Sequence, residues 1–215
     1  MRTLAEIHRP ATWDQVIGQD KAVDTLQRIV KRGAGGRAYW ITGQSGTGKT
    51  TIARLLAAEL DDDYRELDAS DAHNSTLKDL ESTLAMYSIG KGGRAVIINE
   101  AHGLRRDAVR HLLVLLERLP DHAAIIFTTT NEGMASFSDG EDAGPLLSRC
   151  VRVKLTNQGL APLFADRAKQ IAELEGLGGA PDRAYLNLAK RNRNNLRAML
   201  MEIDAGNLTT DDEGE

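Results

Sequence analysis

Apolar residues concentrate in five short segments that predict strands, at 38–42, 64–68, 94–99, 123–129 and 150–155. Between these segments, apolar residues recur three and four positions apart and predict helices at 20–31, 49–60, 75–88 and 106–118. Strands that alternate with helices usually form parallel sheets, because each helix returns the chain to the edge where the previous strand began. The pattern predicts an α/β fold, with a five-stranded parallel sheet covered by helices on both faces.

The strand pattern stops near residue 156. Beyond it the sequence predicts three helices, at 158–177, 181–191 and 194–205, separated by a glycine-rich stretch and by an Asn/Arg-rich stretch. We therefore expect a sheet domain over 1–156, a small all-α lid domain over 157–206, and an acidic, disordered tail over 207–215. Loops are expected at 33–37 and 136–144.

Composition narrows the functional class only a little. The 215 residues carry 27 basic and 31 acidic side chains, a net charge of −4, which argues against indiscriminate nucleic-acid binding but leaves a local basic face open. Cys150 is the single cysteine, so no internal disulfide can form, and no Cys/His cluster has zinc spacing. Without an apolar segment of signal-peptide or membrane-spanning length, we expect a soluble intracellular protein, cytoplasmic or, in a eukaryote, nuclear, with no membrane partner.

A glycine-rich motif follows the first predicted strand and opens a predicted helix. It fits G-x-x-x-x-G-K-[ST] without a mismatch and comprises Gly43, Gln44, Ser45, Gly46, Thr47, Gly48, Lys49 and Thr50. Such a loop points backbone N–H groups at phosphate oxygens, while its lysine reaches the β- and γ-phosphates and its Thr hydroxyl ligates Mg²⁺. The motif predicts a site for ATP and Mg²⁺, with Thr51 as a further contact. An ordinary glycine-rich turn before a helix is the alternative.

Polar residues end the third predicted strand, at Asn99 and Glu100. P-loop ATPases carry an acid here that holds Mg²⁺, often followed by a second acid that orients the attacking water. Glu100 is the candidate for the second role. Asn99 departs from the usual aspartate, because its amide brings no charge to the metal, so we expect looser metal binding and slow turnover. A plain strand end is the alternative for both residues.

The order of the motifs resembles that of AAA+ ATPases, and in particular the subunits that load DNA sliding clamps. Residues 9–19, Arg-Pro-Ala-Thr-Trp-Asp-Gln-Val-Ile-Gly-Gln, resemble the segment that wraps the adenine, which implies nucleotide contacts from Arg9, Val16 and Ile17. Residues 67–71, Leu-Asp-Ala-Ser-Asp, resemble a motif that lies near the DNA backbone in that family. A helix N-cap is the alternative for the second segment.

The resemblance implies three more site residues. Asn131 follows the fourth predicted strand at the sensor-1 position, where a polar side chain binds the γ-phosphate or the lytic water. Arg149 stands in a Ser-Arg-Cys motif through which clamp-loader subunits offer an arginine to a neighbour's nucleotide. Arg197 resembles the sensor-2 arginine of the lid, with Arg191 and Arg193 as nearby competitors for that role. A strand-end cap, a surface arginine and a solvated helix face are the respective alternatives.

The resemblance implies an ATPase that drives conformational change in an oligomer acting on DNA. Its partners would be other AAA+ subunits, with the arginine finger supplied in trans, together with a sliding clamp and primer–template DNA. Residues 6–205 carry the resemblance, and the collar domain of clamp-loader subunits has no counterpart in the sequence. Two rival functions stay open: an ATP-binding switch or scaffold with weak hydrolysis, and another AAA+ remodeller in DNA recombination or repair.

Overall fold

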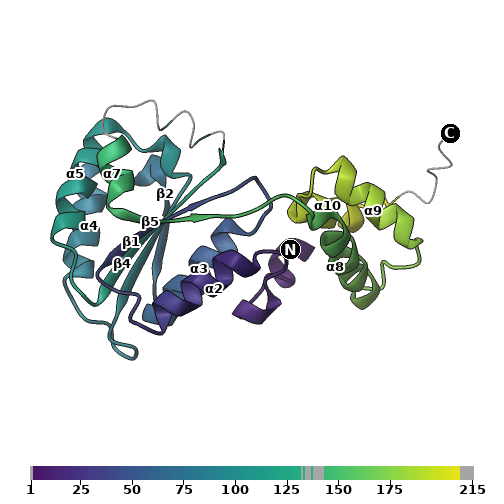
Figure 1. The fold of residues 1–215 in the computed structure, drawn as a ribbon, viewed down its shortest axis with the longest axis horizontal. Helices are drawn as coiled ribbons and strands as arrows, with labels where there is room; N and C mark the ends of the chain where they lie inside the picture. Colours follow the sequence, from purple (N-terminus) through teal and green to yellow (C-terminus); the bar gives the residue numbers. More distant parts are fainter. Residues whose placement is uncertain (1, 132, 134–136, 138–142, 209–215) are drawn as a thin grey trace. The chain divides into compact units, whose positions relative to one another are not determined.

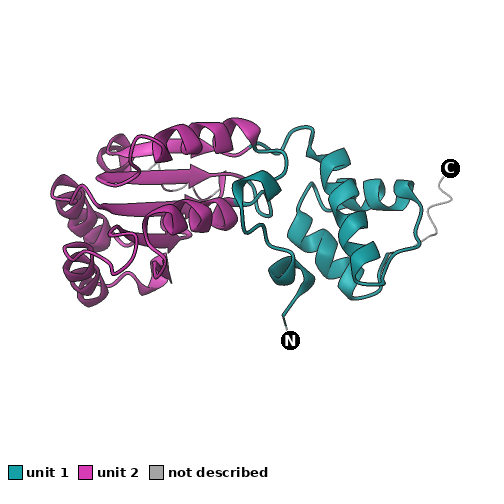
Figure 2. Ribbon diagram, turned by 90° about the horizontal axis from the view of Figure 1, so that it is seen from below, with its two compact units in different colours: residues 1–19, 44–48, 156–215 teal, residues 20–43, 49–155 magenta. Residues whose placement is uncertain are grey.

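The computed structural model describes residues 2–131, 133, 137 and 143–208. The chain divides into two compact units, which Figure 2 colours separately. Unit 1 comprises Met1–Gln19, Gln44–Gly48 and Thr156–Glu215, and unit 2 comprises Asp20–Gly43 and Lys49–Leu155. Residues 209–215, most of the predicted acidic tail, lie outside the described residues.

Unit 2 is built on a parallel sheet. Its strands, in chain order, are β1 (Arg37–Thr42), β2 (Arg65–Asp68), β3 (Arg94–Asn99), β4 (Ala123–Thr129) and β5 (Cys150–Lys154). They lie in the order β2-β3-β4-β1-β5, and every neighbouring pair is parallel. The predicted five-stranded parallel sheet is therefore confirmed.

Helices cover both faces of this sheet, as Figure 1 shows. One face carries α2 (Asp20–Val30) and α3 (Lys49–Leu60), and the other carries α4 (Asn74–Leu84), α5 (Arg106–Glu117) and α7 (Ala143–Ser148). The second face packs into a continuous apolar core in which Trp40, Leu77, Ile98, Leu112 and Phe127 are all buried. The hydrophobic burial of such side chains, about 1.5–3 kcal/mol each, holds the strand ends in fixed positions.

Two predicted boundaries in unit 2 were wrong by more than one residue. The helix predicted at 75–88 ends at Leu84, because the apolar residues that extended its pattern, Met86 among them, belong to an exposed loop rather than to a buried helix face. The loop predicted at 136–144 ends earlier, since α7 already begins at Ala143. Residues 136 and 138–142 of that predicted loop lie outside the described residues.

Unit 1 is helical. It contains α1 (Leu4–Ile7), a short 3-10 turn at Trp13–Gln15, α8 (Leu160–Leu174), α9 (Asp182–Arg191) and α10 (Leu196–Asp204). The predicted helical C-terminal segment is confirmed, with each helix slightly shorter than expected. These helices share a core that includes Leu4, Phe164, Tyr185, Leu188 and Met199. The N-terminal helix α1, which the sequence did not predict, contributes Leu4 to this core.

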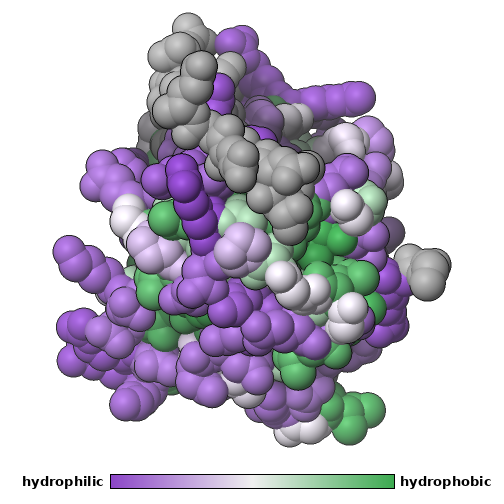
Figure 3. Space-filling view, turned by 90° about the vertical axis from the view of Figure 1, so that its right-hand side faces the viewer, coloured by the Kyte–Doolittle hydropathy of each residue, from purple (hydrophilic) through white to green (hydrophobic). Residues whose placement is uncertain are grey.

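The surface seen in Figure 3 is largely hydrophilic and is interrupted by smaller apolar areas. None of the helices in the part of the chain that the structure describes is both long and apolar enough to cross a membrane.

Candidate nucleotide site

The glycine-rich motif joins the end of β1 to the start of α3, the arrangement the sequence predicts. Gly46 and Gly48 adopt left-handed backbone conformations, with φ of 77° and 98°. The hydroxyl of Thr47 donates to the carbonyl of Gln44 at 2.8 Å, and its backbone N–H donates to the same oxygen at 3.4 Å. The loop is thereby curled tightly before the helix, which is the backbone form that binds phosphate through successive N–H groups.

Lys49 is the first residue of α3 and is only 8 % exposed. Lysine is rarely so buried, and a cation at a helix N-terminus is opposed by the positive end of the helix dipole. An anion bound at this point would interact favourably with both the ammonium group and the helix N-terminus. Thr50 and Thr51 follow in the first turn, half-buried, and each offers a hydroxyl oxygen.

Polar side chains from β2, β3 and β4 meet near the carboxyl end of β3. Asn99 donates through Nδ2 to Oε1 of Glu66 at 2.7 Å, and its Oδ1 accepts from the hydroxyl of Thr128 at 2.8 Å. An amide oxygen has two lone pairs, so this oxygen can still accept a hydrogen bond from a metal-bound water. The hydroxyl, amide and carboxylate oxygens here fit Mg²⁺, which keeps several waters and takes few protein ligands. No cluster of three His, Cys, Asp or Glu side chains among the described residues could hold a metal by itself.

Glu100 follows β3 in a left-handed conformation, with φ of 49° and ψ of 44°. A non-glycine residue there is strained by about 1–3 kcal/mol, a cost that persists at functional positions when the surroundings enforce it. Its side chain is 53 % exposed, and Oε2 lies 3.4 Å from Nδ1 of His102. The same His102 nitrogen lies 3.1 Å from the hydroxyl of Thr129. A carboxylate exposed in this way is available to a water molecule.

The sensor-1 prediction names Asn131, two residues past β4. The structure places Asn131 on the surface and brings Thr128 and Thr129 to Asn99 and His102 instead. Thr128 and Thr129 are 1 % and 0 % exposed. The role of Asn131 stays a prediction, and the two threonines are the residues that connect β4 to this edge of the sheet.

In unit 1, the phosphate loop packs against the turn between α9 and α10. The side chain of Asn157 donates to that of Gln44 and to the carbonyl of Arg193, the latter at 3.2 Å. Asn194 in turn donates to the carbonyl of Asn157 at 3.0 Å. Arg193 and Asn194 both adopt positive φ, 52° and 58°. This amide network joins the loop residue Gln44 to the lid helices.

Gln19 forms a second connection in unit 1. It is 2 % exposed, and its amide exchanges two hydrogen bonds of 3.0 Å with the backbone of Thr156. Its Nε2 also donates to the carbonyl of Thr47 at 3.3 Å. A buried amide satisfied on both ends fixes the geometry of its partners, so Gln19 ties the phosphate loop to the residue that precedes the lid helices.

Comparison with known proteins decides the family. Residues 39–153, more than half of the chain, match the family model described as "ATPase family associated with various cellular activities (AAA)". The chain belongs to the AAA family of ATPases. The match runs from β1 to β5 and includes the phosphate loop and the polar ends of β3 and β4.

Several relatives of this AAA ATPase have names that belong to DNA replication. The chain is 31 % identical over 189 residues to DNA polymerase III subunit gamma of Buchnera aphidicola subsp. Baizongia pistaciae, covering 75 % of this chain and 49 % of the relative. It is 27 % identical over 212 residues to the replication factor C small subunit of Methanosphaera stadtmanae, covering 95 % and 63 %. The chain thus spans about half to two thirds of the length of these relatives.

Solved structures match in fold. A RuvB variant of Thermotoga maritima superposes with a TM-score of 0.70 at 22 % identity, covering 91 % of this chain and 64 % of RuvB. Identity at this level shows the shared fold alone.

Arg149 of this AAA ATPase lies between α7 and β5. Its guanidinium donates to Oε1 of Glu117 at 2.6 Å and to the carbonyl of Pro145 at 3.0 Å. The side chain is 38 % exposed. These contacts hold the arginine at the surface formed by α5 and α7, where a neighbouring molecule can reach it. The next residue, Cys150, is sheltered, and burial raises the pKa of its thiol to about 12.

The predicted nucleotide contacts in unit 1 lie in different settings. Arg197 is exposed in the first turn of α10, whose N-terminus is capped by Asn195 through a 3.2 Å bond from the backbone N–H of Ala198. Ile17 packs against the helical core, whereas Val16 and Arg9 are half-buried outside it. All four residues belong to unit 1, with Arg197 on α10 and the other three in the N-terminal segment 9–17. Their roles toward the nucleotide stay predictions.

Sequence reasoning missed four side chains that organise the site: Gln19, Glu66, His102 and Asn157. Each meets its partner across a long stretch of sequence, 137 residues for Gln19 and 33 for Glu66. Three of the four residues of β2 are charged, so no local signal distinguished Glu66 from its neighbours.

Proposed function

We propose that this chain binds and hydrolyses ATP to drive conformational change in an oligomer acting on DNA, in the manner of a sliding-clamp loader during replication. The observation that carries the proposal is the curled phosphate loop, which leads into the buried Lys49 at the head of α3. The names of the replication relatives support the clamp-loader role.

The residues have separate tasks in this proposal. The backbone N–H groups of 43–48 and the Lys49 ammonium bind the triphosphate, and the segment 9–17 contacts the adenine. Thr50 and Asn99 would hold Mg²⁺, which would supply positive charge beside the phosphates. Glu100 accepts a proton as a water oxygen bonds to the γ-phosphorus and the bond to the β–γ bridging oxygen breaks, giving ADP and phosphate.

Turnover is proposed to be slow. An aspartate at position 99 would add one negative charge beside the metal, and two unit charges 4 Å apart attract by about 4 kcal/mol at an effective dielectric constant of about 20. The neutral amide of Asn99 provides none of this. The same feature supports the second candidate, an ATP-binding switch with weak hydrolysis. Steady-state phosphate release with and without primed DNA separates the two, because stimulated, sustained turnover contradicts a switch.

The site is proposed to be completed by a neighbouring subunit. Arg149 sits on the surface and contacts α5 and α7 rather than the ends of β3 and β4, which suits an arginine that reaches the γ-phosphate of another molecule. A mixing experiment tests this arrangement. Lys49→Ala keeps the arginine but loses its own nucleotide, and Arg149→Ala keeps the nucleotide but loses the arginine.

Each variant alone should hydrolyse little ATP, and an equal mixture should recover a substantial part of the wild-type rate, because the two kinds of subunit complement each other at the shared site. Arg118→Ala is the matched control, since it removes another exposed guanidinium, at the end of α5, and leaves Arg149 and Glu117 in place. A mixture no more active than the sum of its parts would exclude an arginine acting in trans.

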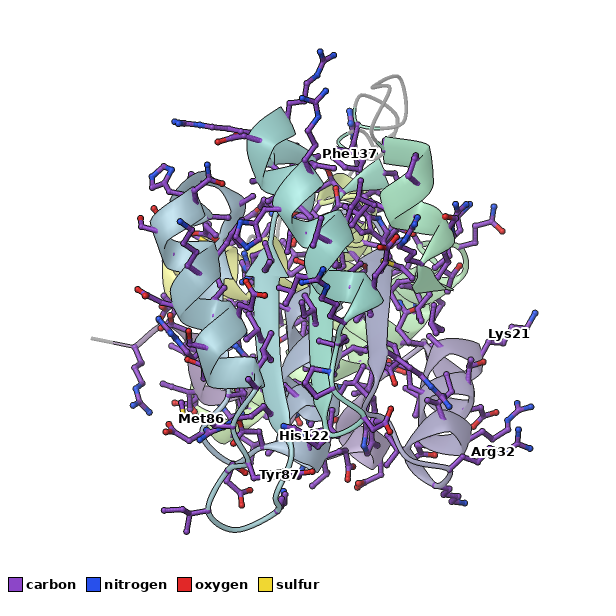
Figure 4. The ribbon with its side chains drawn as sticks, turned by 90° about the vertical axis from the view of Figure 1, so that its left-hand side faces the viewer. Lys21, Arg32, Met86, Tyr87, His122 and Phe137 are labelled. Atoms are coloured by element: carbon purple, nitrogen blue, oxygen red, sulfur yellow. The ribbon has the colours of Figure 1, made fainter. Side chains whose placement is uncertain are left out.

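An exposed apolar loop supports a protein partner such as a clamp. Between α4 and β3, Met86, Tyr87 and Ile89 are 57 %, 71 % and 103 % exposed. The ring of Tyr87 stacks on His122 at 4.0 Å, and Figure 4 shows Met86, Tyr87 and His122 gathered at the end of the sheet opposite Phe137. Large apolar side chains exposed together mark interaction surfaces. Binding assays with sliding clamps, primed DNA and four-way junctions distinguish a loader from a recombination remodeller, and Ile89→Ser should weaken clamp binding specifically.

A further inference from the structure

A continuous line of hydrogen bonds crosses the edge of the sheet beside the nucleotide site. It begins on α3, where Arg54 pairs with Glu66 of β2 through two bonds, Nε to Oε2 at 2.7 Å and Nη2 to Oε1 at 3.2 Å. Oε1 of Glu66 also accepts from Asn99 of β3, and Asn99 accepts from Thr128 of β4. The sequence of groups is cation, carboxylate, amide and hydroxyl, drawn from four elements.

Each group in this line has the chemistry that its neighbours require. The carboxylate of Glu66 can only accept hydrogen bonds, so the Asn99 group that faces it must be the NH₂. The amide oxygen is then directed at Thr128. Glu66 therefore determines which way the Asn99 amide is turned, and with it where the amide oxygen lies.

A carboxylate at position 99 would not fit this arrangement. Its nearer oxygen would take the place of Nδ2, 2.7 Å from Oε1 of Glu66. Two carboxylate oxygens cannot donate a hydrogen bond to each other, and two like charges at that distance repel strongly. The side chain of Glu66 is 23 % exposed, so water screens this repulsion only in part.

We propose that Glu66 is a positioning residue of the nucleotide site and forms a matched pair with Asn99. The one negative charge of this pair lies on Glu66 of β2 and not on residue 99 of β3. Asn99 is thus adapted to its neighbour and is not simply a weakened aspartate. This inference rests on the proposed ATP site, and it identifies Glu66 as the residue that orients the Asn99 amide oxygen toward the metal. An acidic residue at position 99 should therefore favour Mg²⁺ binding only when the residue at position 66 is neutral.

The test compares Asn99→Asp, Glu66→Gln and the double variant Asn99→Asp/Glu66→Gln with the wild type. Asp79→Asn, on the exposed face of α4, is the control for loss of one acid elsewhere. Two quantities are measured: the melting temperature without nucleotide, and the Mg²⁺ concentration that gives half-maximal binding of a fluorescent ATP analogue. The second quantity would not respond to a purely structural ion pair.

The melting temperature of Asn99→Asp should fall by several degrees, and that of the double variant should return most of the way to wild type, because the exchanged pair again has one acid and one amide. Glu66→Gln should require several-fold more Mg²⁺, and the double variant no more than the wild type. A stable Asn99→Asp protein with improved Mg²⁺ dependence would overturn the pair, as would Glu66→Gln with unchanged Mg²⁺ dependence. If no variant, nor the wild type, binds nucleotide, the ATP site fails, while the melting temperatures still report on the pair.

Discussion

Replacing Gly46 with alanine tests the contact between the phosphate loop and the lid turn. A Cβ at this position would lie 1.9 Å from Oδ1 of Asn195 and 2.8 Å from its Cα. The Asn195 side chain could rotate away only by giving up the bond that caps α10, and the backbone Cα has no such freedom. The φ of 77° at Gly46 adds backbone strain for any residue with a Cβ.

Gly48 provides a matched control in the same loop. Its φ is 98°, yet a Cβ there would meet nothing within 4 Å. Both alanine variants should lose about 1–3 kcal/mol to backbone strain, and only Gly46→Ala should lose a further ~1–3 kcal/mol to overpacking. At about 2–4 °C per kcal/mol, Gly46→Ala should melt roughly 2–12 °C below Gly48→Ala.

The assay is thermal unfolding of the nucleotide-free proteins, followed by circular dichroism. Equal melting temperatures for the two variants would refute the close approach of the loop and the α9–α10 turn, because strain alone would then account for both losses.

Further predictions concern single side chains. Gln19→Glu should lower the free energy of unfolding by about 3 kcal/mol or more, because a buried carboxylate would face the carbonyls of Thr47 and Thr156. Gln170→Glu, at an exposed position on α8, is the control and should change the melting temperature little. Equal melting-temperature shifts for the two variants would contradict the role of Gln19. Cys150, with a thiol pKa of about 12 instead of 9, should react with Ellman's reagent at pH 8 about 10³-fold more slowly than an ordinary thiol, because so little thiolate is present. Its rate should rise on unfolding in urea, and fast reaction of the folded protein would show that the thiol is not sheltered.

The sequence predicted the central strands well because β1, β3 and β4 are largely buried. All seven residues of β4 are buried, so the strand appears as an uninterrupted apolar segment, and β3 was likewise bounded correctly. The helix α4 was predicted to end four residues too late, since the exposed apolar residues Met86 and Tyr87 continue its apolar spacing. The spacing of apolar residues in a sequence shows where a helix face could be buried. It does not show whether another element packs against that face.

In the candidate site, too, one part was predictable from the sequence and another was not. The phosphate loop was predictable because its chemistry depends on the local order of glycines, Lys49 and Thr50. Glu66 was not, because its significance arises only when β2 pairs with β3 and brings it to Asn99. Contacts between side chains far apart in sequence depend on register and helix packing, which no local pattern specifies.

The central claim is that the loop ending in Lys49 binds the triphosphate of ATP. Isothermal titration of Mg·ATP into the wild type, Lys49→Ala and Lys21→Ala tests it most directly, with Lys21 chosen because it is exposed on α2, as Figure 4 shows. The account predicts saturable binding to the wild type and to Lys21→Ala, and affinity on the order of 10–100-fold weaker for Lys49→Ala, as expected for loss of a charge-assisted hydrogen bond. Equal affinities for all three folded proteins, or no binding by any of them, would contradict the claim.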